Sequence, residues 1–314
     1  MLIKRRTKPL LLKKHEALIP RLQRNFPRFD EIEYDYHKYR KGYEGERQVD
    51  YYLEIVSDDY TILQDVCLQL RGKTFQMDNL VITPNGIYII EVKNYEGTII
   101  FDTALNQFTR DDGEAEAVFG HPVTQAEIQK MNLQNWILDK KLPNLPIHYF
   151  IAISNPATMI KMKGEASEIS HVVTHAAGIP VKIVEMDKRL AQSKLKEHRR
   201  LGNLILKECR EYDQDIMQKH QLTERALLPG VACPECGQLG MKRIYNNWAC
   251  TKCKHTSRQA HVQAMEDYRL LIGQRMRNAH CRHWLQLNSK NIATKLMREY
   301  GMEYRKEQRC WYKK

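Results

Sequence analysis

The sequence predicts an α/β protein with a mixed sheet, followed by a small cysteine-rich module and a helical tail. An amphipathic helical stripe near residue 50 precedes three strand-like segments, and a second helical segment and another strand follow them. Two CxxC pairs then stand within one short stretch of the C-terminal third. At 314 residues the chain exceeds the usual size of one hydrophobic core, so we expect several domains.

The N-terminal segment, residues 1–40, mixes basic residues with two prolines and has no clear periodicity, which predicts a basic extended arm. Residues 1–41 contain 12 Lys or Arg against 5 Asp or Glu, and residues 261–314 contain the same numbers, in a chain of net charge +12. Basic ends suit a nucleic-acid partner, because contacts to phosphates release counterions. The alternative is that these charges only promote solubility.

The main domain is expected over residues 41–225. One apolar helix face, formed by Val49, Leu53 and Val56, indicates a helix. The Thr-Pro-Asn-Gly sequence at residues 83–86 indicates a tight turn between two strands, which makes them antiparallel neighbours. In order, the expected elements are a helix at about 42–56, strands at about 60–68, 75–83 and 86–93, a helix at about 124–139 and a strand at about 147–153.

Three charged side chains interrupt two of these apolar strands. Glu91 and Lys93 are two residues apart in one strand, so they project from the same face. Asp78 lies in the preceding strand, and antiparallel pairing would bring it close to Glu91. Burying such groups is costly unless they are paired or bind an ion. Two hard oxygen donors suit Mg²⁺ or Mn²⁺ better than Zn²⁺.

A plainer interpretation of Glu91 and Lys93 is a solvated ion pair on an edge strand, which would contribute less than about 1 kcal/mol. The possible convergence of Asp78 on Glu91 favours the metal centre over this interpretation.

The motifs around these residues resemble a known family. GYEGERQV at Gly42–Val49, MDNLVITPNGIYIIEVKNYEG at Met77–Gly97 and HPVTQ at His121–Gln125 are similar to the nuclease-related domain (NERD) family of the PD-(D/E)xK nuclease superfamily. The resemblance covers roughly residues 40–155. It differs at Met77, where the superfamily motif has proline, and at His121, where the family often has asparagine.

The resemblance implies a restriction-endonuclease-like αβββαβ core and a metal-dependent phosphodiesterase. Asp78 and Glu91, with the backbone carbonyl of Val92, would hold Mg²⁺ or Mn²⁺, and Lys93 would orient the attacking water. Glu46 matches an acid on the preceding helix. Beyond these residues, Gln125 matches a glutamine that would bind substrate or steady the lysine.

The four clustered cysteines predict a zinc ribbon at residues 228–258. Cys233 and Cys236 form one CxxC pair, Cys250 and Cys253 form a second, and thirteen residues separate the two pairs. Four thiolates at this spacing form a closed structural Zn²⁺ site, whose role is to fold a segment too small for its own core. A redox or disulfide role is the alternative.

The tail, residues 262–314, is expected to be a winged-helix-like module that binds nucleic acid. Ser289 is a suitable N-cap for a helix at about 290–300, which Gly301 would end, with Ile292 among its inward-facing residues. A small helical cap with a solvated face is the alternative. The residues expected to contact nucleic acid are Lys290, Asn291, Thr294, Lys295 and Arg298 on the helix and Arg305, Lys306 and Arg309 on the wing.

Together these features predict a cytoplasmic nuclease that acts on DNA, in DNA processing or repair. A catalytically inactive nucleic-acid-binding protein and an RNA-processing nuclease are the alternatives, since backbone cleavage depends on phosphates that both polymers share. No apolar run approaches the ~20 residues needed to cross a bilayer, so no membrane partner is expected.

Overall fold

A computed structural model describes residues 1–143, 145–165, 169–190 and 198–313. The chain divides into two compact units. The first unit contains Met1–Pro9 and Arg40–Tyr212, and the second unit contains Leu10–Tyr39 and Asp213–Lys314. This division groups the cysteine-rich segment and the tail with most of the N-terminal segment, which the sequence suggested were separate domains.

The N-terminal segment is mostly regular structure, so the expectation of an extended arm is wrong. It forms strand β1 (Leu2–Lys4), helix α1 (Leu10–Leu18), a 3₁₀ turn η1 (Ile19–Arg21) and the start of the long helix α2 (Phe29–Leu53). Leu11, Leu18 and Phe29 are buried in the core of the second unit. Packing against distant residues thus orders a segment whose own periodicity is weak.

The first unit is built on a six-stranded mixed sheet with the strand order β1-β2-β3-β4-β8-β10. Strands β2, β3 and β4 pair antiparallel, whereas β4–β8, β8–β10 and β1–β2 are parallel. The strands expected from the sequence are confirmed with small shifts at their ends. Their bounds are β2 (Thr61–Leu70), β3 (Lys73–Ile82), β4 (Ile87–Lys93) and β8 (Ile147–Ile153). The edge strand β10 (Val173–His175) was not predicted.

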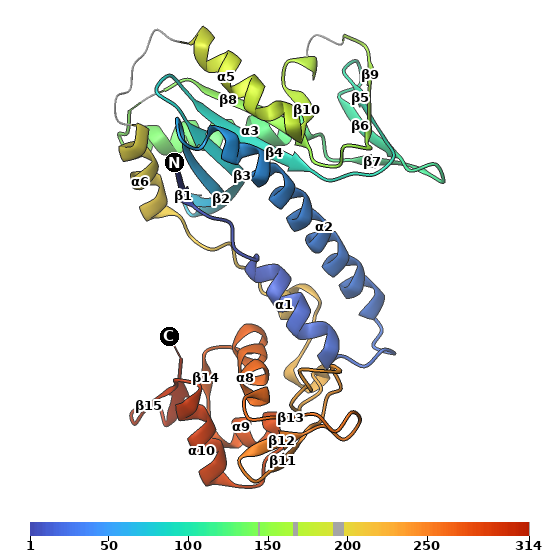
Figure 1. Cartoon of the computed structure of the whole chain (residues 1–314), viewed down its shortest axis with the longest axis vertical. Coiled ribbons are helices and arrows are strands. Elements are labelled where there is room, and N and C mark those ends of the chain that lie inside the picture. The colour runs from blue at the N-terminus through green and yellow to red at the C-terminus, as the bar shows by residue number, and fades with distance from the viewer. Residues whose placement is uncertain (144, 166–168, 191–197, 314) are drawn as a thin grey trace. The chain divides into compact units, whose positions relative to one another are not determined.

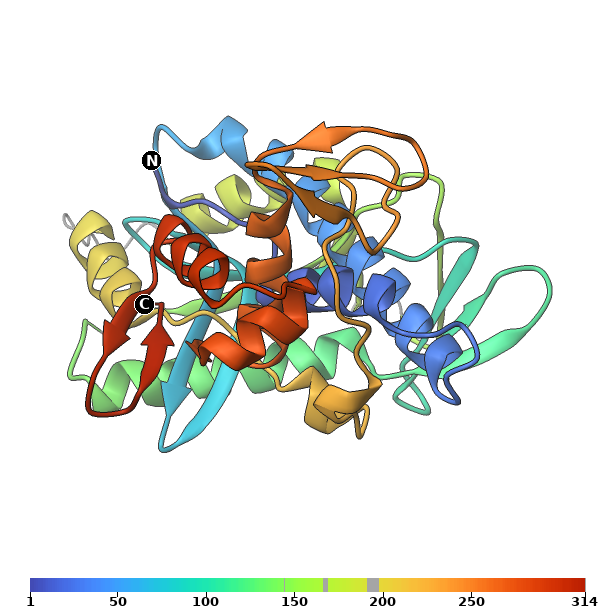
Figure 2. The same cartoon turned by 90° about the horizontal axis from the view of Figure 1, so that it is seen from below.

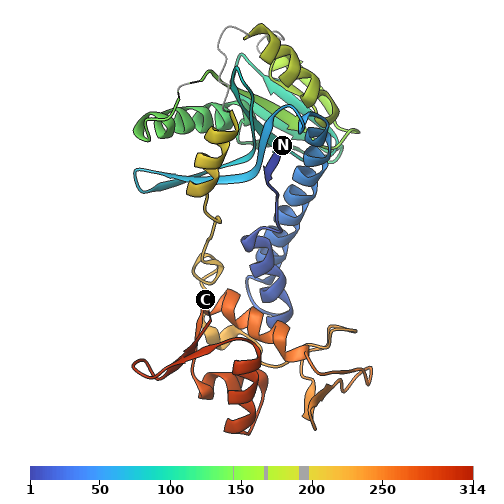
Figure 3. The same ribbon diagram turned by 60° about the vertical axis from the view of Figure 1, so that its left-hand side comes forward.

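Helices cover both faces of this sheet (Figure 1, Figure 3). Helix α3 (Pro122–Asp139) and helix α6 (His198–Glu208) pack on one face, through Leu133, Trp136 and Leu201. The C-terminal half of α2 and helix α5 (Ile179–Arg189) pack on the other face, with turns η2 (Glu54–Val56) and η3 (Ala176–Gly178) beside them. Strand β4 is therefore buried on both sides, as its near-continuous apolar sequence requires.

A second sheet interrupts the expected run of elements and was not predicted. Its strand order is β7-β6-β5-β9, and its short strands lie between β4 and α3 and after β8 in the chain. Phe101 and Phe108 form its buried face. The strand bounds are β5 (Thr98–Asp102), β6 (Gln107–Asp111), β7 (Glu116–Phe119) and β9 (Met159–Lys163).

The second unit has one hydrophobic core to which the cysteine-rich segment and the tail both contribute. Figure 2 shows the tail helices and the terminal hairpin in red. Two three-stranded sheets occur, with orders β11-β12-β13 and β14-β16-β15. The elements are α7 (Ile216–Lys219), η4 (Glu224–Ala226), β11 (Lys242–Ile244), β12 (Asn247–Ala249), β13 (Thr256–Ser257), α8 (Ala260–Leu271), β14 (Arg275–Met276), α9 (Asn278–Leu285), α10 (Lys290–Glu299), β15 (Glu303–Arg305) and β16 (Cys310–Tyr312).

The expected cap and stop of helix α10 are confirmed. The Ser289 hydroxyl accepts a hydrogen bond from the Ile292 backbone N–H at 3.3 Å, and Gly301 has a φ of +85° just past the helix. Ile292 itself is exposed, so the expectation that it faces inward is wrong. The side chain lies on the first turn, at the margin of the face that Ala293 and Leu296 bury.

Among the described residues, no helix is both long enough and apolar enough to span a membrane. Helix α2 has sufficient length, but its sequence is rich in charged and polar side chains.

Candidate active site and zinc centre

The candidate active site lies where β3 and β4 pair in the middle of the large sheet. The register places Asn79 opposite Ile90, which puts Asp78 beside the end of β4 that carries Glu91. The Asp78 carboxylate accepts a hydrogen bond of 2.8 Å from the backbone N–H of Val92. The sequence-based expectation that the two strands are antiparallel neighbours is confirmed.

Glu91 is buried, with only 2% of the residue exposed. Its Oε1 accepts from the Lys93 ammonium group at 2.7 Å, and its Oε2 accepts from Gln129 Nε2 at 2.7 Å. Strand β4 lies between β3 and β8, so the interpretation of Glu91 and Lys93 as a solvated edge-strand pair is wrong. Both carboxylate oxygens are instead held in a fixed orientation inside the first unit.

Helix α3 supplies two glutamines to this site. Gln125 Oε1 accepts a second hydrogen bond from the Lys93 ammonium group, at 2.9 Å. Gln129 lies one turn further along the helix and contacts Glu91, a contact that was not predicted. The signal was available, because residues four apart on a helix share a face.

Helix α2 contributes Glu46, which is paired with an arginine from the N-terminal segment. Arg6 Nη1 donates to Glu46 at 2.6 Å, and its Nε donates to Asp50 at 2.8 Å. Arg6 Nη2 donates to the backbone carbonyl oxygen of Asp78 at 2.7 Å. Only 2% of the Arg6 side chain is exposed. No local pattern identifies this residue, because its partners are at least 40 positions away.

The carboxyl groups of the site interact electrostatically. Burial raises the pKa of Asp78 well above its usual range, and the charges of Glu91 and Glu46 raise it further. Burial also raises the pKa of Glu46 to about 7, although the Arg6 charge opposes this. For Lys93, burial alone would lower the pKa, but the charge and hydrogen bond of Glu91 together with the charge of Asp78 outweigh burial, and the pKa is raised. Lys93 therefore stays an ammonium group at neutral pH.

The raised pKa of Glu46 predicts how the stability of the metal-free protein depends on pH. The folded protein keeps a proton that the unfolded chain releases above about pH 4.5, so the free energy of unfolding falls as pH rises from about 4.5 to 7. Glu46→Gln removes this contribution. In EDTA, we expect the variant to be more stable than wild type by roughly 1–3 kcal/mol above pH 7, and closer to wild type at pH 4.5.

Denaturant unfolding of both proteins at several pH values measures this difference. A constant difference between pH 4.5 and 8 would contradict the assigned cause. Glu44→Gln is the matched control, because Glu44 lies on an exposed face of the same helix turn and pairs with Arg40 at 3.4 Å.

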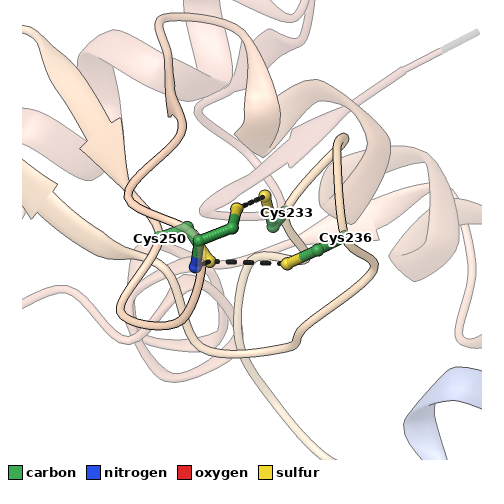
Figure 4. Close-up of side chains that lie close together, drawn as sticks. Cys233, Cys236 and Cys250 are labelled. Atoms are coloured by element: carbon green, nitrogen blue, oxygen red, sulfur yellow. Dashed lines mark hydrogen bonds between the residues drawn. The ribbon is translucent and has the colours of Figure 1, made fainter.

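The four clustered cysteines converge as expected. Their sulfur atoms all lie within 4.8 Å of one another, and the Cys233–Cys253 and Cys236–Cys250 separations are both 3.6 Å. Figure 4 shows Cys236 and Cys250 turned toward each other. A tetrahedral zinc ion with Zn–S bonds of ~2.3 Å separates its sulfurs by ~3.8 Å. The cluster is therefore consistent with a structural zinc site.

The tail residues expected to contact nucleic acid lie on one helix and one hairpin. Lys290, Asn291, Lys295 and Arg298 are exposed on α10, and Arg305, Lys306 and Arg309 are exposed on the β15–β16 hairpin. Thr294 is different, because its hydroxyl accepts from Asn278 Nδ2 at 2.9 Å and joins α10 to α9. Arg305 lies over the Tyr312 ring, 4.1 Å from its centroid.

Comparisons with known proteins found a matching family model and a similar relative. The family model described as "Nuclease-related domain" (NERD) matches residues 41–154. An uncharacterized protein of Bacillus anthracis is 27% identical over 135 residues, which make up 42% of this chain and 61% of that relative. The aligned stretch thus spans about three fifths of the relative's length. No solved structure matches the chain.

Proposed function

From the nuclease-related domain that residues 41–154 form, we propose that this protein is a metal-dependent nuclease that hydrolyses phosphodiester bonds of DNA. The observation that carries the proposal is the carboxylate pair of half-buried Asp78 and buried Glu91, beside the Lys93 ammonium group. The sequence αβββαβ from α2 to β8 is the element order expected of a restriction-endonuclease-like core. The inserted sheet β5–β7 leaves that order intact.

The residues at the site fit Mg²⁺ or Mn²⁺. Burial and mutual repulsion raise the pKa of Asp78 next to Glu91, and a divalent cation would relieve this cost. In this proposal Asp78, Glu91 and the carbonyl oxygen of Val92 hold the ion. When bound, it would polarise a phosphate oxygen and lower the pKa of the attacking water.

The surrounding side chains orient and stabilise the reacting groups. Lys93 presents a positive charge that would position water and offset the negative charge developing on phosphorus. Gln125 steadies the Lys93 ammonium group and could also donate from its amide nitrogen to a phosphate oxygen. Gln129 holds Glu91 in place. In this scheme Glu46 adds a carboxylate to the site, and its ion pair with Arg6 offsets part of the negative charge.

Lys93→Ala is expected to lower the cleavage rate by about 10²–10³-fold, because it removes one preorganised charge from the transition state. The assay incubates purified protein with plasmid DNA, single-stranded DNA and RNA, each with Mg²⁺, Mn²⁺ or EDTA. Wild type should cleave DNA with a divalent ion and fail to cleave it in EDTA. Equal cleavage by wild type and variant would reject the nuclease assignment, whereas faster cleavage of RNA would identify RNA as the substrate.

Lys130→Ala is the matched control for this substitution. Lys130 lies on α3 beside Gln129, but it pairs with Glu127 at 3.8 Å and contacts none of the proposed catalytic groups. Its cleavage rate should stay within about threefold of wild type. A similar loss in both variants would mean that the lysines act through general affinity for phosphates.

We propose further that the tail binds DNA through the outer face of α10 and the β15–β16 hairpin. Helix, strand, two helices and two strands follow in order from α8 to β16, which is the arrangement of a winged helix. The exposed basic residues of α10 lie where a recognition helix would meet the major groove.

Replacing Lys290, Lys295 and Arg298 by Ala together should weaken DNA binding and make it less sensitive to salt. Loss of three phosphate contacts would reduce the slope of log K against log salt by about 2–3. Fluorescence anisotropy at several salt concentrations measures this slope. The control replaces Lys161, Lys163 and Lys188, three exposed lysines of the first unit. An identical change in both variants would contradict a tail-specific interface.

A further inference from the structure

A second group of metal-ligand residues lies in the second unit, away from the four cysteines. His15 lies on α1, Asp35 on α2 and His220 directly after α7. Their candidate ligand atoms all lie within 4.8 Å of one another. The segments that carry the two histidines are 205 positions apart in the chain, so folding alone brings these groups together.

Both imidazoles are buried and lack hydrogen-bond partners on the atoms that could bind an ion. His15 and His220 are each 0% exposed. His15 Nε2 and both ring nitrogens of His220 have no hydrogen-bond partner. Buried polar atoms in folded proteins almost always have a partner, so three orphaned nitrogens in one place require an explanation.

The Nδ1 atom of His15 has the kind of contact that a metal-binding histidine usually makes. His15 Nδ1 lies 2.8 Å from the backbone carbonyl oxygen of Leu11, so Nδ1 carries the proton and Nε2 carries the lone pair. His220 Nδ1 lies 3.6 Å from Glu31 Oε1, and its Nε2 lies 3.7 Å from Asp35 Oδ2. Metal-binding histidines usually donate their second N–H to a carbonyl or carboxylate, as His15 Nδ1 does to Leu11. The two separations at His220 are longer than a hydrogen bond, so both of its ring nitrogens stay unbonded.

The Asp35 carboxylate is oriented by a residue that is not itself a candidate ligand. Lys219 donates to Asp35 Oδ2 and to the Tyr39 hydroxyl. Carboxylates that bind metals are commonly oriented by such hydrogen bonds. Lys219 bonds the same oxygen, Oδ2, that lies 3.7 Å from His220 Nε2. A carboxylate oxygen has two acceptor sites, so Oδ2 can accept from Lys219 and still serve as a ligand.

We propose that His15, Asp35 and His220 bind a first-row divalent ion of the zinc class, which joins α1 and α2 to the segment after α7. Two imidazole nitrogens and one carboxylate oxygen suit Zn²⁺ or Co²⁺, rather than Mg²⁺ or Ca²⁺. Bond lengths of ~2.0–2.2 Å correspond to ligand separations of ~3.3 Å. To form such a site, the ligand atoms would have to move closer together by at most ~1.5 Å, which side-chain rotation can achieve.

The test counts zinc in full-length protein that carries Asp78→Asn, so that an ion at the carboxylate centre does not enter the count. After zinc loading and dialysis, mass spectrometry should find two zinc ions per chain. His15→Gln and His220→Gln should each reduce the count to one. His148→Gln is the matched control, because His148 also has a buried ring nitrogen without a partner but lies in the first unit. It should retain two ions.

The ion kept by the four cysteines reports that the second unit of each variant has folded. Cobalt gives an independent readout: the difference spectrum between the parent chain and His220→Gln should lack thiolate charge-transfer bands and show only nitrogen and oxygen donors. A parent chain that binds one equivalent, or histidine variants that keep two, would overturn the proposal. The outcome does not depend on nuclease activity.

Discussion

Asp78→Asn should abolish DNA cleavage and, at the same time, stabilise the metal-free protein. The substitution removes a carboxylate whose pKa is raised by burial and by the charges of Glu91 and Glu46. Asparagine keeps an oxygen that can accept from the Val92 N–H, so the local backbone contact persists. The repulsion between Asp78 and the other two carboxylates disappears, and so does the carboxylate charge of Asp78 that would attract a divalent ion.

We expect the cleavage rate to fall by about 10³-fold or more, because both ion binding and charge stabilisation are lost. In EDTA at pH 8, the Tm should rise by about 2–6 °C, which corresponds to 1–2 kcal/mol for a unit of this size. Gel assays of plasmid cleavage with Mn²⁺ and thermal unfolding measure the two effects. A variant that loses activity and also stability would indicate that Asp78 serves the fold.

Asp187→Asn is the matched control for this pair of effects. Asp187 is a buried carboxylate of the first unit, and it accepts hydrogen bonds from Thr83, Tyr88 and Asn85 near the opposite end of β4. Weakening that network should lower the Tm and leave cleavage within about threefold of wild type. The two substitutions therefore predict opposite signs for stability and different outcomes for activity.

Local patterns were sufficient for the strands and helices that surround this centre. The Thr83–Gly86 turn fixes the β3–β4 register, and that register alone places Asp78 beside Glu91. The periodicity of apolar residues and the residue preferences of turns each depend on a few neighbouring residues. A single sequence is therefore enough to predict these elements. The same reasoning placed α3, which brings Gln125 to Lys93.

Contacts between distant segments were not predictable in this way. Arg6 reaches Glu46, Asp50 and Asp78 from a segment without periodicity, and only the pairing of β1 with β2 places it there. His15 and His220 are likewise brought together by the fold, and no local pattern predicts that they lie close to each other. Lone basic residues and histidines are common, and nothing in their neighbourhood reveals a partner that is far away in the chain.

The inserted sheet β5–β7 and β9 was missed for a related reason. Its strands are only four or five residues long, and β5 is the one among these four whose buried and less buried positions alternate regularly. Strands this short are stabilised by their neighbours in the sheet more than by their own sequence. The parallel β5–β9 pairing joins segments that α3 and β8 separate.

Cys236→Ser is expected to release the zinc ion of the four-cysteine cluster and to destabilise the second unit well beyond the ribbon. Cys233, Cys250 and Trp248 belong to the same hydrophobic core as the helices α8, α9 and α10. Structural zinc contributes about 10–16 kcal/mol to the folding of small zinc-binding peptides. Loss of one thiolate therefore removes a large share of what holds this core together.

Zinc content, far-UV circular dichroism and limited proteolysis should change together in Cys236→Ser. Cleavage sites should appear in residues 228–258 and also in the tail, because the two segments share Trp248 and Trp284 in one core. Cys281→Ser is the matched control: it is buried in the same core, its sulfur lies 3.9 Å from the Ala293 carbonyl oxygen, and a serine hydroxyl could donate there. Equal loss of zinc in both variants would mean that unfolding of the core, rather than removal of a ligand, releases the ion.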